Sequence, residues 1–145
     1  MPDRIINKKF NLSLLRKHFP QLLFIFGKKS VGMAVLKESL STPEKMSPVF
    51  KRRIAHLNNL MMVVCDFTNG PAPEPDKPHS HPHEQITYVA EGDLWLFLGE
   101  DKHRLSRGDI VTVPPGIPHC IQNISGFVRL IDTFCPIRED FLKKK

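Results

Sequence analysis

Cysteine is scarce in this sequence of 145 residues, which contains only Cys65, Cys120 and Cys135. An odd number with no C-x-x-C pair argues against a disulfide framework and indicates a reducing compartment, most simply the cytoplasm. Long apolar runs are also missing, since none reaches the roughly 18 residues that a membrane-spanning helix needs. Apolar residues make up 41% and charged residues 25% of the chain, which excludes disordered and fibrous classes. The length suits one globular domain.

The body of the chain also lacks an excess of positive charge, although the net charge is +6. Residues 1–32 carry seven Lys or Arg side chains and one acidic one, so the charges of residues 33–145 sum to zero. A nucleic-acid-binding domain is expected to carry its basic patch on the folded surface. The sequence therefore predicts no nucleic-acid partner.

Residues 1–32 differ in character from the rest and are interpreted as a basic N-terminal extension. Their apolar stretch at residues 22–26 is shorter than the roughly 7–15 residues of a signal peptide, and no A-x-A cleavage site follows it. A basic helix on a membrane surface is an alternative. We expect an incidental extension, with Met33 as the natural start and residues 33–145 as a single domain.

Aromatic residues are few, at 8%, whereas proline (13) and glycine (8) are plentiful. Such frequent backbone breakers favour short strands over long helices. The β-branched runs and their regular spacing predict an all-β sandwich or barrel. A Pro-rich loop at residues 69–75 is expected to form an ordered rim. The predicted strands are residues 51–57, 60–67, 84–90, 94–98, 110–113, 120–123 and 127–134, with a minor strand at 102–105.

The densest cluster of metal-competent side chains lies at residues 79–85, with His119 further along the chain. In an extended segment, positions two apart face the same side, so His79, His81 and Gln85 can all project inward. Three imidazoles and one oxygen ligand suit a divalent first-row metal. The sequence therefore predicts a metal site at His79, His81, Gln85 and His119.

The spacing of these residues resembles the two motifs of the cupin superfamily. The first motif appears as His79-x-His81, three residues, Gln85, six residues, Gly92. The second appears as Gly108, five residues, residues 114–116 as Pro-Pro-Gly, two residues, His119, three residues, Asn123. The resemblance covers residues 50–137 and implies a double-stranded β-helix, or jelly-roll barrel. The alternative is an ordinary turn-rich barrel with an empty pocket.

Each motif element has a physical reason for its place. Gly92 and Gly108 fall where chain reversals need a positive φ, and the Pro-Pro-Gly turn delivers His119 to the mouth of the barrel. Asn123 is expected to satisfy nearby backbone groups.

Gln85 departs from the family pattern, which has glutamate at that position. An amide leaves the charge of the ion unneutralised, which makes a bound metal a stronger Lewis acid but a more weakly held one. Two alternatives remain open: water takes the place of Gln85, or His83 competes for the ion.

The last predicted strand supplies a second group of candidates. Alternation places Leu130, Asp132 and Phe134 on one face, and an acid between apolar residues is costly unless it is paired or used. Arg138 follows just beyond and is placed to hold a carboxylate in a fork. The alternatives are a structural pair between Asp132 and Arg138, or an outward-facing Asp132 with Thr133 facing in.

The ending of the chain, residues 130–142, is similar to that of a narrower group of cupins that ketonise 4,5-unsaturated uronates in pectin and alginate breakdown. The resemblance implies a His, His, Gln, His metal set, with Asp132 as general acid/base, Arg138 as anchor for the substrate carboxylate and Phe134 in the sugar pocket. The spacing from the second histidine to Gln85 is one residue shorter than that group leads us to expect.

The leading hypothesis is therefore a cytoplasmic enzyme that uses one divalent ion, Zn, Ni, Mn or Fe, to ketonise a sugar acid. The rival hypotheses are a non-catalytic cupin that senses sugar acids and an iron-dependent dioxygenase. We also expect a homodimer, for which residues 127–134 or 51–57 could serve as pairing edge strands.

Overall fold

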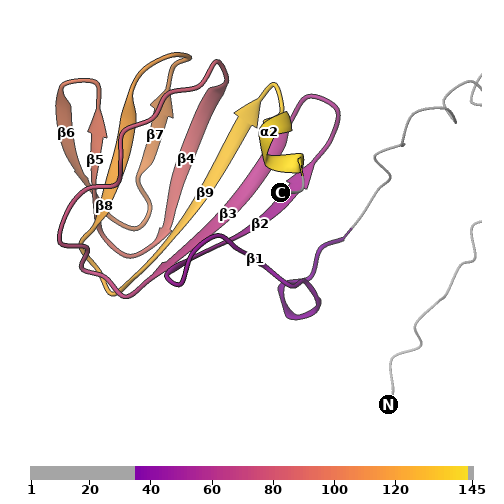
Figure 1. The fold of residues 1–145 in the computed structure, drawn as a ribbon, viewed down its shortest axis with the longest axis horizontal. Helices are drawn as coiled ribbons and strands as arrows, with labels where there is room; N and C mark the ends of the chain where they lie inside the picture. Colours follow the sequence, from indigo (N-terminus) through magenta and orange to yellow (C-terminus); the bar gives the residue numbers. More distant parts are fainter. Residues whose placement is uncertain (1–34, 144–145) are drawn as a thin grey trace, which may run out of the picture. The chain divides into compact units, whose positions relative to one another are not determined.

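Two antiparallel β-sheets form the body of the protein in the computed structural model, which describes residues 35–143 (Figure 1). The larger sheet has six strands in the order β1-β2-β3-β9-β4-β7, and the smaller has three in the order β6-β5-β8. The predicted all-β class is confirmed. The strands are β1 (Glu44–Lys45), β2 (Phe50–His56), β3 (Met61–Thr68), β4 (Glu84–Glu91), β5 (Leu94–Leu98), β6 (Asp101–Leu105), β7 (Ile110–Val113), β8 (His119–Asn123) and β9 (Phe127–Cys135).

Each predicted strand is present, and its ends differ from the prediction by at most one residue. Three short elements had no signal in the sequence: strand β1, the 3-10 helix η2 (Glu38–Leu40) and the helix α2 (Glu139–Leu142). Two to four residues are too few to display a hydrophobic period. The helix α2 lies beyond the end of β9 (Figure 1). Among the described residues, no helix is long and apolar enough to cross a membrane.

The core lies between the two sheets, because inward-facing side chains from both contribute to it. Met61 and Val63 of β3, Val89 of β4 and Val128 of β9 are all at most 1% exposed. Leu94 of β5 completes this cluster from the smaller sheet. Alternation along each strand thus fills the interior, and some of these inward residues, among them Val63 and Leu94, also line the cavity described below.

The position of β9 in the sheet corrects one expectation. It pairs with β3 on one side and β4 on the other, so residues 127–134 do not form an edge strand. Strand β2 is also covered in part, since β1 pairs with Lys51 and Arg52. The homodimer remains a prediction, but β9 cannot join two copies by adding strand to strand.

The Pro-rich loop after β3 is held in place by backbone hydrogen bonds, as predicted for an ordered rim. The amide of Ala72 donates to the carbonyl of Asn123 (2.9 Å), and that of Asp76 donates to Ile121 (2.8 Å). The loop therefore runs along β8 and enters the site from a fixed direction. The predicted extension, residues 1–32, lies outside the described residues, so its interpretation stays a prediction.

The positive φ expected at two motif glycines is present, with 83° at Gly92 and 101° at Gly108. At Gly92 an added Cβ would overlap the backbone carbonyl oxygen of Phe127, whereas at Gly108 it would meet no atom within 4 Å. A residue with a side chain would therefore have a strained backbone at both positions, and its Cβ would overlap other atoms only at position 92.

We expect Gly108→Ala to lower the free energy of unfolding by about 1–3 kcal/mol through strain. Gly92→Ala should lower it by at least about 1 kcal/mol more, because the overlapping atom is backbone and cannot swing away. Urea denaturation of both variants measures the difference. Equal losses of unfolding free energy in the two variants would show that the overlap with the Phe127 carbonyl oxygen is relieved without cost.

Candidate metal centre

Two segments far apart in the sequence bring the histidines together. The loop before β4 runs beside the start of β8, where His79 donates its amide to the carbonyl of His119 (3.0 Å) and accepts from its amide (2.9 Å). The chain then bends at Pro82 and His83 before β4 begins at Glu84. Residues 79–85 are thus not one continuous strand, but the side chains of His81 and Gln85 still lie next to each other.

The rings of His79, His81 and His119 each direct one nitrogen to a common point, and these three atoms lie within 4.8 Å of one another. The Nδ1 atoms of the two buried rings face backbone carbonyls, at 3.0 Å from His83 O for His81 and 2.9 Å from Ile117 O for His119. A carbonyl only accepts, so each Nδ1 carries a proton and each Nε2 offers a lone pair.

The site fits a metal ion because one of these inward-facing nitrogens lacks a hydrogen-bond partner among the described residues. His119 Nε2 is buried and finds no hydrogen-bond partner in the part of the chain that the structure describes. Partial burial, followed by the neighbouring His119 and His81, lowers the pKa of His79 to about 4. Burial likewise lowers the pKa of His119. Neutral imidazoles at pH 7 are the form that binds divalent metals.

Gln85 extends the cluster from the first inward position of β4. Its Oε1 lies 2.9 Å from His81 Nε2. Since His81 already carries its proton on Nδ1, this contact brings together two electron-pair donors, as adjacent ligands of one cation would be. The structure therefore brings the three histidines and Gln85 together, and their role as metal ligands stays a prediction.

Two neighbouring residues bear on the sequence analysis, namely His83, which was an open alternative as a ligand, and Asn123. His83 points its Nδ1 into a buried place without a partner among the described residues and is absent from the histidine cluster. Asn123 Oδ1 is also buried without a partner within residues 35–143. The expectation that the Asn123 side chain satisfies the backbone is thus wrong for its oxygen, and its main-chain carbonyl holds the rim loop instead.

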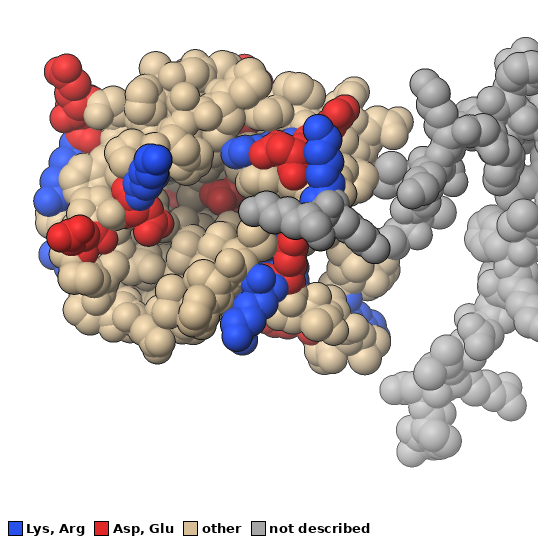
Figure 2. All heavy atoms as spheres, in the orientation of Figure 1, with Lys and Arg blue, Asp and Glu red and all other residues tan. Residues whose placement is uncertain are grey.

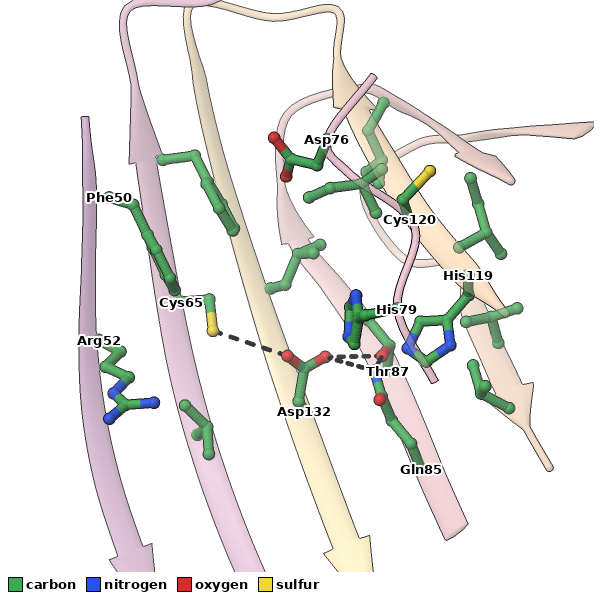
Figure 3. A pocket seen from close by; sticks show the side chains of 18 of the residues that line it. Phe50, Arg52, Cys65, Asp76, His79, Gln85, Thr87, His119, Cys120 and Asp132 are labelled. Carbon is green, nitrogen blue, oxygen red and sulfur yellow. Dashed lines mark hydrogen bonds between the residues drawn. The ribbon is translucent and has the colours of Figure 1, made fainter. Parts of the chain in front are cut away.

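Asp132 lies in the middle of the site, on β9 between β3 and β4 (Figure 3). Its Oδ1 accepts from Thr87 Oγ1 (2.6 Å) and Gln85 Nε2 (3.4 Å), and its Oδ2 accepts from Cys65 Sγ (3.6 Å). Burial raises the pKa of Asp132, and the hydrogen bonds from Thr87, Cys65 and Gln85 oppose that rise. The carboxyl group thus faces inward, which excludes the outward-facing alternative.

Arg138 approaches the site from the far end of β9. Its guanidinium donates to Asp140 through Nε (3.3 Å) and Nη2 (2.8 Å), so the suggested pair with Asp132 is not formed. The ring of Phe141 stands 4.1 Å from the guanidinium carbon and that of Phe134 5.5 Å away. A second guanidinium, that of Arg52, covers Phe141 at 4.3 Å. These contacts bind α2 to the mouth of the cavity.

A cavity of about 410 Å³ joins these groups. Its size suits a small molecule such as a monosaccharide. The face seen in Figure 2 is hollowed, with acidic atoms visible inside the opening and charged side chains around it. The predicted residues that line the cavity are His79, Gln85, His119, Asp132, Phe134 and Arg138.

Sequence reasoning missed Thr87, Cys65 and Phe141, which touch the predicted residues. Thr87 carried a weak signal, because it is polar and lies two positions after Gln85 on the inward face of β4. Phe141 follows the last strand, where no strand period could place it.

Comparison with known proteins defines the class first. The cupin domain family matches residues 69–134. The two sheets and the histidine cluster together form a cupin barrel, and the chain belongs to the cupins.

Within the cupins, the chain is similar to the pectin degradation protein KdgF of Dickeya dadantii (strain 3937). The two are 34% identical over 101 residues, which is 68% of this chain and 89% of the relative. The solved structure of KdgF from Halomonas sp. is 30% identical with a TM-score of 0.69, over 76% of this chain and 99% of that one. A solved RmlC-like cupin from Shewanella frigidimarina is 30% identical with a TM-score of 0.68, over 76% and 96% of the two chains.

Proposed function

We propose that this protein is a metal-dependent cupin enzyme of pectin or alginate breakdown, which converts a 4,5-unsaturated monouronate into its linear 5-keto-4-deoxy form. The observation that carries the proposal is the carboxyl group of Asp132, which shares one cavity with His79 and His119 and is hydrogen-bonded to Gln85. The similarity to a pectin degradation protein supports the choice of substrate class. We further propose that the protein is a homodimer in the cytoplasm. Neither point affects the proposed chemistry.

The proposed reaction is an isomerisation, so no oxidant or reductant is required. The bond between C1 and the ring oxygen breaks, the C1 hydroxyl loses its proton to leave an aldehyde, and C4 gains a proton as C5 becomes a ketone. The enzyme therefore has to move protons and stabilise negative charge on oxygen.

His79, His81, Gln85 and His119 would hold the divalent ion. When bound, such an ion polarises substrate oxygens as a Lewis acid and stabilises the negative charge that develops on them. Because Gln85 contributes no charge, the four side chains leave the positive charge of the ion available to an anionic substrate.

Asp132 is assigned the proton transfer. Its carboxyl group lies inside the cavity beside Gln85, and its three donors hold it in a single orientation. A positioned carboxyl group typically contributes about 10²–10⁴-fold to the rate of a proton transfer.

Arg138 and Phe134 are assigned to substrate binding. The fork that Arg138 now presents to Asp140 is the geometry with which an arginine holds a carboxylate. Asp140 is 54% exposed at its side chain, so it can yield its place to the substrate carboxylate at the cost of a surface contact. The ring of Phe134, 5.6 Å from that of His81, forms an apolar wall between the two ends of the site.

Arg138→Lys should raise KM about 10–100-fold and change kcat little, because lysine keeps the charge but loses the two parallel hydrogen bonds. Steady-state kinetics at saturating metal measure both constants. Arg53→Lys is the matched control, since Arg53 pairs with Asp66 and Glu38 away from the cavity. An unchanged KM for Arg138→Lys would remove the assignment of Arg138 as the carboxylate anchor.

The test of the proposed function is turnover of 4,5-unsaturated galacturonate by protein loaded with Zn, Ni, Mn or Fe. We expect 5-keto-4-deoxyuronate to form faster than it does spontaneously and the acceleration to vanish with a chelator. Two rival results identify the alternatives: oxygen uptake with Fe(II) indicates a dioxygenase, and tight binding of the sugar acid without turnover indicates a sensor. Either one without ketonisation would overturn the proposal.

A further inference from the structure

Thr87 is a buried polar residue that lies between the proposed metal ligands and the proposed acid. It is 5% exposed and stands on β4 directly opposite Asp132 of β9. Its Oγ1 donates to Asp132 Oδ1 (2.6 Å) and accepts from Gln85 Nε2 (2.9 Å). Figure 3 shows the hydrogen bond between Thr87 and Asp132 within the cavity.

The direction of these hydrogen bonds follows from the number of protons available. A carboxylate only accepts, so the single hydrogen of the Thr87 hydroxyl points to Asp132. The hydroxyl oxygen therefore accepts in its contact with Gln85, and only the amide nitrogen of Gln85 has a hydrogen to donate. The amide oxygen is consequently turned to the other side, where it lies 2.9 Å from His81 Nε2.

We propose that Thr87 is a positioning residue that turns the oxygen of Gln85 toward the histidine cluster and holds the carboxyl group of Asp132 beside it. Groups that orient metal ligands typically change metal affinity or activity by about 10–100-fold when they are removed. The part of the inference that concerns Asp132 rests on the proposed function. The part that concerns Gln85 rests only on the metal site.

The same geometry explains why glutamine occupies position 85. A glutamate there would present an oxygen without a proton to Thr87 Oγ1 and to Asp132 Oδ1, which lie 2.9 and 3.4 Å from the present nitrogen. Two carboxylates would then face each other across a hydroxyl that has one hydrogen to give. Gln85 and Asp132 are thus chemically matched, and Thr87 connects them.

The experiment compares Thr87→Ser with Thr87→Ala and Thr87→Val in the full chain. Serine keeps the hydroxyl, alanine differs from serine only by its loss, and valine keeps the shape of threonine. Thr133→Val is the matched control, because Thr133 lies on the neighbouring strand beside Ile86 and outside the cavity lining. Circular dichroism verifies that each variant is folded, and calorimetric titration with Zn²⁺ alone measures metal affinity.

We expect Thr87→Ala and Thr87→Val to bind Zn²⁺ about 10–100-fold more weakly than the wild type. Thr87→Ser and Thr133→Val should bind it with unchanged affinity. Wild-type affinity in Thr87→Ala would overturn the inference, as would a loss in Thr87→Ser equal to that in Thr87→Ala. If valine prevents folding, the serine and alanine pair still decides the question.

Kinetics with the unsaturated uronate then test the effect on Asp132 at saturating Zn²⁺. A misdirected carboxyl group should lower kcat of Thr87→Ala at least about 10-fold and leave KM within about 2-fold, since substrate binding is assigned to Arg138. An unchanged kcat would overturn this part. If the wild type shows no turnover, the proposed function fails, and the Zn²⁺ titration still decides the role of Thr87.

Discussion

Asp132→Asn is expected to abolish turnover of the unsaturated uronate while leaving the metal bound. The asparagine has nearly the same shape, and its Oδ1 can still accept from Thr87 and Gln85, so the surroundings should be preserved. An amide does not exchange a proton near neutral pH, so the proton transfer loses the group assigned to it. We expect kcat to fall by at least about 10²–10⁴-fold.

Two measurements separate this outcome from a damaged site. Calorimetric titration with Zn²⁺ should give the same stoichiometry and nearly the same affinity for Asp132→Asn and the wild type. Asp66→Asn is the control, because Asp66 is tied to Arg129 (2.6 Å) and Arg53 (3.1 Å) outside the cavity lining and should keep its kcat. Retained turnover in metal-loaded Asp132→Asn would refute its role as general acid/base.

The barrel could be predicted from the sequence because its signals are periodic and local. Alternating apolar residues gave each of the longer strands, and the glycines at 92 and 108 have the positive φ that their turns require. The order of strands in the sheet has no such signal, since pairing joins residues far apart in the chain. For that reason β9 was expected at an edge, whereas it lies between β3 and β4.

The metal cluster was also accessible from the sequence, because the spacing of two motifs fixes where three histidines meet. The groups that orient these histidines could not be predicted from the sequence. The Nδ1 partners of His81 and His119 are backbone carbonyls, which have no residue identity to recognise. The partner of Arg138 could not be predicted either, because Asp140, two residues further along the chain, takes the guanidinium that the alternative interpretation had paired with Asp132.

His119→Ala is expected to remove metal binding, and turnover with it. His119 supplies the buried Nε2 that finds no partner within the described residues, as expected for a nitrogen that binds an ion. Loss of a ligand from a set of four should weaken Zn²⁺ binding by more than the roughly 10–100-fold that loss of a supporting group costs. The variant should remain folded, because the backbone bridge to His79 does not involve the ring.

His83→Ala is the control for this prediction. His83 is close in sequence and its ring lies 5.6 Å from that of His81, yet it is not part of the cluster. Zn²⁺ at 100 times its dissociation constant stabilises the folded state by about 2.7 kcal/mol through mass action, so it should raise the Tm of the wild type and of His83→Ala. The Tm of His119→Ala should not respond. The reverse pattern would mean that His83 holds the ion, and a third variant, His79→Ala, would then show whether the cluster takes part at all.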